Sequence, residues 1–189
     1  MKALEEKILQ EGEVVDGDIL KVDGFVNHQV DALLMEEIGK DMAEHFKGQG
    51  ITKVFTIESS GIAPALFTAK ELGVPLVILK KQQTADSLKT EVWQTEVVSY
   101  TKDISYRLTL AKNYISDEDH VLIIDDFLAN GEAATGAIRL IRKAHATVAG
   151  LGVLIEKAFQ PGREKLESQG IHVYAQASIK AFENGKVVF

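Results

Sequence analysis

The sequence predicts an α/β fold in which helices flank a mainly parallel sheet. Two observations support this prediction. Short, apolar, β-branched segments typical of strands buried on both faces recur along the chain, and segments of helical periodicity alternate with them. One longer stretch, residues 82–110, interrupts this alternation, and its first part, residues 82–90, is polar. Because 189 residues carry no internal repeat and no linker, we expect one domain over residues 1–189.

The chain begins with elements that precede the expected core of the sheet. Residues 2–11 have the pattern of a short amphipathic helix that ends at Gly12, and residues 14–22 have the pattern of a strand pair or an extended segment. Residues 32–47 are helical by period, with Asp31 placed to cap them.

Two strand segments then end in polar residues. Residues 51–57 predict a strand that runs into Glu58-Ser59-Ser60-Gly61, and a helix follows with Pro64 in its first turn. Hydroxyl and backbone N–H groups at a helix start suit an anion, although a simple capping loop is the alternative. Residues 74–79 predict the next strand, which ends at Lys80-Lys81.

Residues 82–110 predict a two-stranded ribbon. Residues 91–100 and 104–110 alternate in polarity, and the turn is expected near Lys102-Asp103. A long insertion beside a binding face is often a lid that excludes water, so we expect a β-ribbon lid. The sequence assigns no role to Trp93 or Tyr106 within it.

The central motif follows the ribbon. Residues 121–124 predict a short strand buried on both faces, and the carboxylates of Asp125 and Asp126 come directly after it. A loop containing Gly131 leads to a helical segment whose apolar face begins at Ala134. Ligands of open α/β sheets bind beyond the carboxyl ends of strands, where a helix N-terminus suits a phosphate. The two carboxylates would repel phosphate and instead suit hydroxyl groups, a cation or developing positive charge. Solvated loop carboxylates are the alternative.

The last third of the chain repeats the alternation. Residues 148–155 predict a long apolar strand that ends at Glu156-Lys157, and residues 163–169 predict a helix. Residues 171–175 predict a final strand of the sheet, and residues 179–189 complete the domain.

This arrangement resembles the phosphoribosyl-diphosphate (PRPP) signature of the type I phosphoribosyltransferases, in which two acidic residues and a small-residue loop follow an apolar strand. The common form has threonine where this chain has Asn130 and Ala133, a departure that fits the xanthine phosphoribosyltransferase branch. The stretch around Leu20 and Asn27 and the segment that begins at Lys157 also resemble this branch. The resemblance covers nearly the whole chain and implies the type I phosphoribosyltransferase fold, with a hood formed by about residues 1–30 and the C-terminal segment.

The resemblance also implies roles for individual residues. The catalytic carboxylates would be Asp125 and Asp126. The loop for the 5′-phosphate of PRPP would be Ala129, Asn130, Gly131, Glu132 and Ala133, with Glu132 pointing away from the phosphate. Pyrophosphate would contact Ser59, Ser60, Gly61 and Lys81. The purine would contact Leu20, Asn27 and Lys157. No residue is assigned as a direct metal ligand, and magnesium is expected as a cofactor bound with PRPP or pyrophosphate.

The implied reaction converts xanthine and PRPP to xanthosine 5′-monophosphate and pyrophosphate. A cationic Lys157 would favour oxo-purines over adenine, whose amino group is itself a donor. Two alternatives stay open: a hypoxanthine–guanine phosphoribosyltransferase, and a non-catalytic PRPP-binding regulator. The regulator is less favoured because the residues before the first core helix are too few for a winged helix and are not basic.

Composition limits the partners. The net charge of −7 disfavours broad binding to nucleic acid, and no apolar run is long enough to span a membrane. The chain has no cysteine, so disulfide and thiol chemistry are excluded, and we expect a cytoplasmic protein. The resemblance implies a homodimer.

Overall fold

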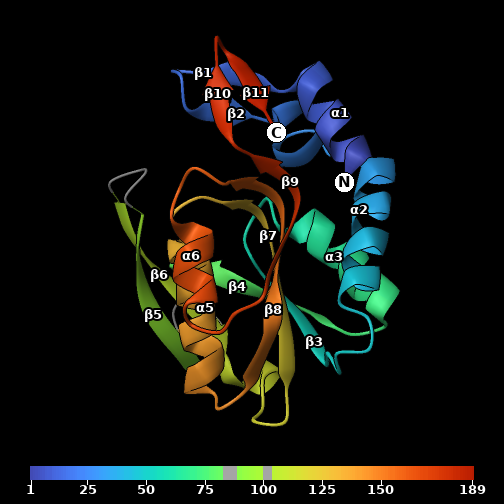
Figure 1. Cartoon of the computed structure of the whole chain (residues 1–189). Helices are drawn as coiled ribbons and strands as arrows, with labels where there is room; N and C mark the ends of the chain where they lie inside the picture. The colour runs from blue at the N-terminus through green and yellow to red at the C-terminus, as the bar shows by residue number, and fades with distance from the viewer. Residues whose placement is uncertain (83–88, 100–103) are drawn as a thin grey trace.

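The computed structural model describes residues 1–82, 89–99 and 104–189 and contains a seven-stranded sheet in the order β5-β6-β4-β3-β7-β8-β9 (Figure 1). The strands of this sheet are β3 (Lys53–Ile57), β4 (Leu76–Lys81), β5 (Val92–Ser99), β6 (Ile104–Ala111), β7 (His120–Leu128), β8 (Thr147–Lys157) and β9 (Val173–Ile179). The five strands β4, β3, β7, β8 and β9 pair in parallel, whereas β6 pairs antiparallel with both β4 and β5. The predicted mainly parallel α/β sheet is therefore confirmed.

The order of the strands creates a switch point between β3 and β7. After β3 the chain passes through α3 (Ile62–Leu72) to β4 on one side, whereas β7 pairs with β3 on the other side and continues through α5 (Glu132–Lys143) to β8. The loops that leave β3 and β7 therefore diverge at neighbouring positions of the sheet edge. A crevice is expected where connections diverge in this way.

Helices cover both faces of the sheet (Figure 1). On one face, α1 (Lys2–Glu11), α2 (Ala32–His45) and α3 pack in a hydrophobic cluster with residues such as Leu122 and Ile124 of β7. On the other face, α5 and α6 (Gly162–Glu167) pack with alternate residues such as Ile123. Burial of β7 on both faces explains its continuous apolar run.

A hood lies beyond the carboxyl ends of the central strands, close to both chain termini (Figure 1). It contains α1 and two hairpins, β1 (Glu13–Val15) with β2 (Ile19–Lys21) and β10 (Ala181–Glu183) with β11 (Lys186–Val188). A π-helical turn (Asp23–Asn27) leads to α2, which Asp31 caps by accepting a hydrogen bond from the Leu34 N–H at 3.1 Å. The predicted strand pair and cap are confirmed.

Several predicted boundaries change in the structure, and the change in β7 bears most directly on the site. The strand predicted over residues 121–124 continues to Leu128 as β7, because Phe127 and Leu128 still pair with β8. Asp125 and Asp126 therefore lie within a strand and not after it. The predicted ribbon is formed by β5 and β6 and joins the sheet through β4, with a short 3₁₀ turn (Lys112–Tyr114) after β6. Its predicted turn near Lys102-Asp103 lies outside the described residues.

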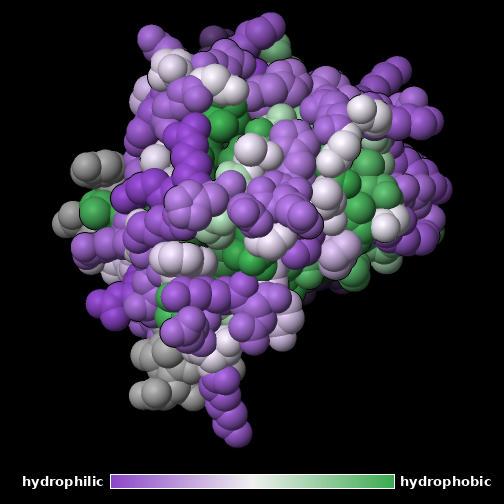
Figure 2. Space-filling view, turned by 90° about the horizontal axis from the view of Figure 1, so that it is seen from below, coloured by the Kyte–Doolittle hydropathy of each residue, from purple (hydrophilic) through white to green (hydrophobic). Residues whose placement is uncertain are grey.

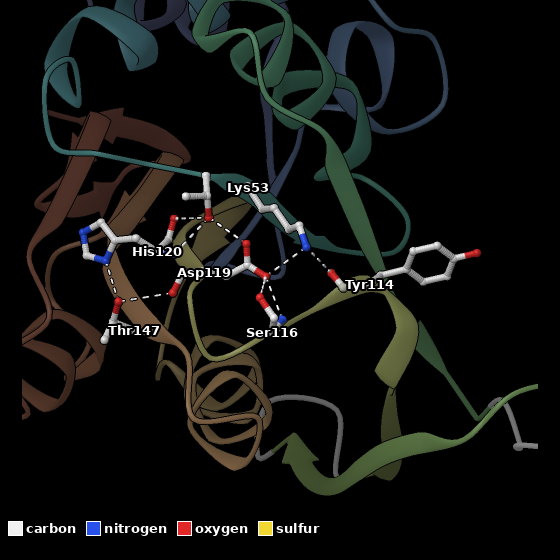
Figure 3. A network of polar contacts seen from close by, with 7 residues as sticks. Lys53, Tyr114, Ser116, Asp119, His120 and Thr147 are labelled. Carbon is white, nitrogen blue, oxygen red and sulfur yellow. Dashed lines mark hydrogen bonds and ion pairs between the residues drawn. The ribbon is translucent and has the colours of Figure 1, made fainter.

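Figure 3 shows a polar network where β3, β7 and β8 begin, at the edge opposite the hood. The Asp119 carboxylate accepts hydrogen bonds from Lys53 Nζ at 2.9 Å, Thr52 Oγ1 at 2.8 Å and the Ser116 N–H at 2.8 Å. Burial raises the pKa of Asp119, but these hydrogen bonds outweigh it and hold the pKa below its usual value. The network fixes the start of three strands.

The molecular surface opposite the hood is mostly hydrophilic, with apolar atoms exposed in separate patches (Figure 2). Among the described residues, every helix is too short or too polar to cross a membrane.

Candidate active site

A cavity of about 500 Å³ opens at the carboxyl ends of the central strands, beneath the hood. It collects almost every site residue that the sequence predicts, from five separate segments of the chain. The predicted residues that line it are Leu20, Asn27, Ser59, Ser60, Lys81, Asp125, Asp126, Ala129, Asn130, Gly131, Glu132, Ala133 and Lys157. Gly61 does not line the cavity and instead lies directly behind it, against Asp125.

Asp125 is a buried carboxylate in the wall of the cavity, with 9% of its surface exposed. Its Oδ1 accepts a hydrogen bond from the Asp126 N–H at 3.0 Å. Burial raises the pKa of Asp125 well above its usual value, and the adjacent negative charge of Asp126 raises it further. A carboxylate held in a poorly solvated wall interacts strongly with any positive charge that develops near it.

Asp126 is half-buried and also lines the cavity. Its Oδ1 accepts a hydrogen bond from the Phe127 N–H at 2.9 Å, which fixes the direction of the carboxylate. The two acids thus stand side by side on β7, one buried and one open to solvent. Hydroxyl groups or a cation can be shared between them, whereas a phosphate group would be repelled.

The loop after β7 has the geometry of an anion site. Gly131 adopts a left-handed conformation with φ of 81°, and a Cβ at this position would lie 3.3 Å from the Gly162 Cα. Only glycine adopts this conformation without strain. Gly131 is the N-cap residue of α5 and has no side chain to cap the helix. The N–H groups at a helix N-terminus suit an anion.

The loop after β3 lies next to it. Ser59 and Ser60 line the cavity, and Gly61 is the N-cap residue of α3. The Glu58 carboxylate accepts a hydrogen bond from the backbone N–H of Lys81 at 2.5 Å and lies 3.5 Å from Lys80 Nζ. The structure therefore separates the two lysines: Lys81 lines the cavity, whereas Lys80 pairs with Glu58 and does not.

Lys157 lies at the hood end of the cavity, at the last position of β8. Its Nζ donates a hydrogen bond to the Asp18 carbonyl oxygen at 2.7 Å and lies 5.8 Å from the centre of the Phe182 ring. Burial lowers the pKa of Lys157, although the charge of Asp18 opposes this shift. Leu20 and Asn27 line the same end of the cavity, so a cationic donor, an amide and an apolar side chain face one space.

Comparison with known proteins identifies the family. A model of the phosphoribosyl transferase domain matches residues 27–182. Xanthine phosphoribosyltransferase of Agathobacter rectalis is 58% identical over 189 residues, which cover 100% of this chain and 98% of the relative. Xanthine phosphoribosyltransferase 1 of Clostridium botulinum (strain Hall) is 56% identical, with 100% of this chain and 99% of the relative covered. The chain belongs to the xanthine phosphoribosyltransferase family.

Solved structures of adenine phosphoribosyltransferases share the fold. The enzyme from Giardia lamblia superposes with a TM-score of 0.77 at 22% identity, covering 93% of this chain and 97% of that chain. The enzyme from Rhodothermus marinus gives a TM-score of 0.75 at 24% identity, covering 95% and 100%. The predicted type I phosphoribosyltransferase fold is therefore confirmed for this chain.

Sequence reasoning about this family member missed the contribution of the ribbon. Val97 of β5 and Tyr106 of β6 line the cavity, and Lys81 Nζ lies 5.2 Å from the centre of the Tyr106 ring. Burial raises the pKa of Tyr106, and the charges of Asp125 and Glu132 raise it further. The two-residue period of a strand could have revealed this. Tyr106, Leu108 and Leu110 lie on the same face of β6, and the two leucines are buried, so Tyr106 also faces inward.

Proposed function

We propose that the protein transfers the phosphoribosyl group of PRPP to xanthine, forming xanthosine 5′-monophosphate and releasing pyrophosphate. The observation that carries the proposal is the single cavity in which an acidic pair, two loops suited to anions and a cationic lysine meet. A substrate with phosphate groups at both ends of a sugar needs two such loops. The relatives named xanthine phosphoribosyltransferase support the choice of base.

The cavity suggests how its own residues would act. The bond from the sugar C1 to the pyrophosphate oxygen breaks, a bond from C1 to a purine nitrogen forms while that nitrogen loses its proton, and the sugar carries positive charge between the two events. Asp125 and Asp126 would bind the ribose hydroxyls and stabilise this charge. The loop of residues 129–133 would bind the 5′-phosphate, while Ser59, Ser60 and Lys81 would bind pyrophosphate, with Gly61 behind them in the same loop. Leu20, Asn27 and Lys157 would orient the base.

Magnesium fits this donor set. The described residues contain no cluster of three or more histidine, aspartate or glutamate side chains that could hold a metal ion. Magnesium commonly binds through one or two carboxylates together with substrate phosphates and water. We propose that Asp125, Asp126 and the ligand oxygens hold it, and that it neutralises part of the pyrophosphate charge.

The first experiment measures pyrophosphate release with xanthine, guanine, hypoxanthine or adenine at fixed PRPP and magnesium. We expect the highest kcat/KM with xanthine and no release with adenine. A clear preference for hypoxanthine and guanine would support the alternative transferase and overturn the assignment of Asn27 and Lys157. Tight PRPP binding without release from any base would favour the regulator.

A second experiment tests the role of the acidic pair. Replacing both Asp125 and Asp126 with asparagine keeps their size but removes the charge that favours the cationic transition state. We expect kcat to fall by more than about 100-fold, while the calorimetric affinity for PRPP changes far less. Equal losses in kcat and in PRPP affinity would show that the carboxylates act in ground-state binding.

The assembly and location of the protein are also proposals. We propose that it acts as a homodimer in the cytoplasm. Sedimentation equilibrium of the purified chain, which has a mass of 20.7 kDa, tests the dimer by giving the mass of the assembly directly.

A further inference from the structure

An ion pair between Glu156 and Arg163 joins β8 to α6, next to the cavity residue Lys157 in the chain. Glu156, the neighbour of Lys157 in β8, has only 2% of its surface exposed. Its Oε1 accepts a hydrogen bond from Arg163 Nε at 2.6 Å, and its Oε2 accepts one from Arg163 Nη2 at 2.7 Å. Ser178 Oγ of β9 donates a further hydrogen bond to Oε2 at 3.1 Å. The carboxylate is therefore held in one orientation by two-point contact with the guanidinium group.

The guanidinium group of Arg163 joins three elements. Its Nη1 donates to the Val173 carbonyl oxygen at 2.9 Å and to Glu167 Oε1 at 3.0 Å. Arg163 thus connects α6, which contains it, to β8 through Glu156 and to β9 through Val173. The hydrogen bonds to Glu156 raise the pKa of Arg163 above its usual value, so the guanidinium group stays charged. Lysine could not reproduce this planar set of contacts.

The ion pair joins the two ends of the segment of residues 157–163, because Glu156 directly precedes this segment and Arg163 is its last residue. The segment contacts both ends of the cavity. At its start, Lys157 follows Glu156 directly and faces the hood end. At its end, Gly162 precedes Arg163, and its N–H donates to the Ala129 carbonyl oxygen at 3.0 Å. A Cβ at Gly162 would collide with the same Ala129 oxygen, so the two backbones are in direct contact. The position of the loop at 129–133 therefore depends on where α6 begins.

We propose that Glu156 and Arg163 are positioning residues that hold Lys157 and the loop of residues 129–133 in one fixed arrangement. Breaking the pair weakens the binding of purine and PRPP together, although neither residue lines the cavity. This inference rests on the proposed function, because it takes Lys157 as the purine contact and residues 129–133 as the 5′-phosphate contact. It assigns Glu156 and Arg163 a role beyond stability.

The structure supplies a matched control for this proposal. Asp119 and Lys53 form another largely buried ion pair of the same sheet, with Asp119 Oδ2 2.9 Å from Lys53 Nζ, at the edge away from the cavity (Figure 3). Glu156→Gln and Asp119→Asn both replace a buried carboxylate with an amide of the same size. Both variants are expected to unfold at lower urea concentration, because each replaces a charged hydrogen-bond acceptor of a cation with a neutral amide.

The test compares KM values measured by pyrophosphate release, after the wild type has shown transfer to its best base. Glu156→Gln should raise KM for both the base and PRPP by roughly 10- to 100-fold, since small misplacements of binding groups have effects of this size. Asp119→Asn should leave both KM values within about twofold. Arg163→Lys keeps the positive charge but loses the planar guanidinium group and its two-point contact with Glu156. This variant gives the second measurement if Glu156→Gln does not fold.

Two outcomes would overturn the proposal. Unchanged KM values in folded Glu156→Gln or Arg163→Lys would reduce the pair to a stabilising role, like that of Asp119 and Lys53. A rise in KM for one substrate alone would show that the pair does not connect the two ends of the cavity. Calorimetric PRPP affinity of each variant, measured without base, separates either outcome from a failure of the proposed transfer reaction.

Discussion

Gly61 offers a sharp test of the loop that we assign to pyrophosphate. Its φ of −72° is ordinary for any residue, so replacement by alanine carries no backbone strain. At such a position a glycine-to-alanine change usually stabilises a protein by about 0.4–1 kcal/mol through the unfolded state. In this structure, however, the added Cβ would overlap with Thr56 Oγ1 and would lie 3.2 Å from Asp125 Oδ1.

The collision with Thr56 makes Gly61→Ala destabilising and not stabilising. Thr56 is fully buried in β3, and its β-branched side chain cannot easily rotate away. Overpacking of this kind costs about 1–3 kcal/mol. If the loop moves to relieve it, we expect Gly61→Ala to raise KM for PRPP by roughly 5- to 100-fold, at about 1.4 kcal/mol per tenfold. Pyrophosphate release at varied PRPP, with urea unfolding in parallel, measures both effects.

A double variant makes the prediction refutable. Thr56 Oγ1 has no hydrogen-bond partner among the described residues, so Thr56→Ala sacrifices no protein hydrogen bond and makes room for the new methyl group. Thr56→Ala/Gly61→Ala should therefore recover most of the PRPP affinity that Gly61→Ala loses. If Gly61→Ala matches the wild type in KM and stability, or if the double variant shows no recovery, the steric reasoning is wrong.

Three further predictions follow from the charges of the structure. Asp126→Asn removes a neighbouring charge that raises the pKa of Asp125, so the variant should have a lower Asp125 pKa than the wild type. The fall of kcat/KM with decreasing pH should therefore occur at lower pH in the variant, and a shift to higher pH would contradict this. Lys157→Met should lower kcat/KM for xanthine by roughly 10- to 100-fold, which corresponds to loss of a charged hydrogen bond, whereas an unchanged value would remove Lys157 from the purine site. His45 Nε2 lies 2.8 Å from His172 Nε2, and burial, with the charge of His172, lowers the pKa of His45. The unfolded state therefore binds more protons as pH falls through about 6.5, so the urea midpoint should fall between about pH 7 and pH 5, and less steeply in His45→Gln.

The periodicity of the chain determined most of the fold. Apolar runs such as residues 121–124 are typical of strands covered on both faces, and their alternation with segments of helical period predicted the parallel sheet. Helix limits such as Gly12 and Asp31 were also predictable, because caps are local features of the sequence. The identity of the cavity residues followed mainly from resemblance to a family.

Strand limits and the ribbon needed more than local pattern. The extension of β7 through Asp125 and Asp126 comes from pairing with β8, whose Val153 pairs with Asp125 although it lies 28 residues later in the chain. No local propensity of two aspartates predicts this extension. The same pairing buries Asp125 and raises its pKa. The inward position of Tyr106 was predictable because it shares a face of β6 with Leu108, two residues later. Its closeness to Lys81 depends on how β6 joins β4.

The sequence by itself determined which residue types are present at the ends of strands: the acidic pair, the small-residue loop, the serine loop and the lysine. The tertiary structure alone decided that they face one cavity, because the strand order places β3 beside β7 and sends their loops apart. It also decided that Glu156 meets Arg163 and that Gly162 touches Ala129. Such contacts depend on how α6 packs against the sheet, and packing between distant segments leaves no local pattern in the sequence.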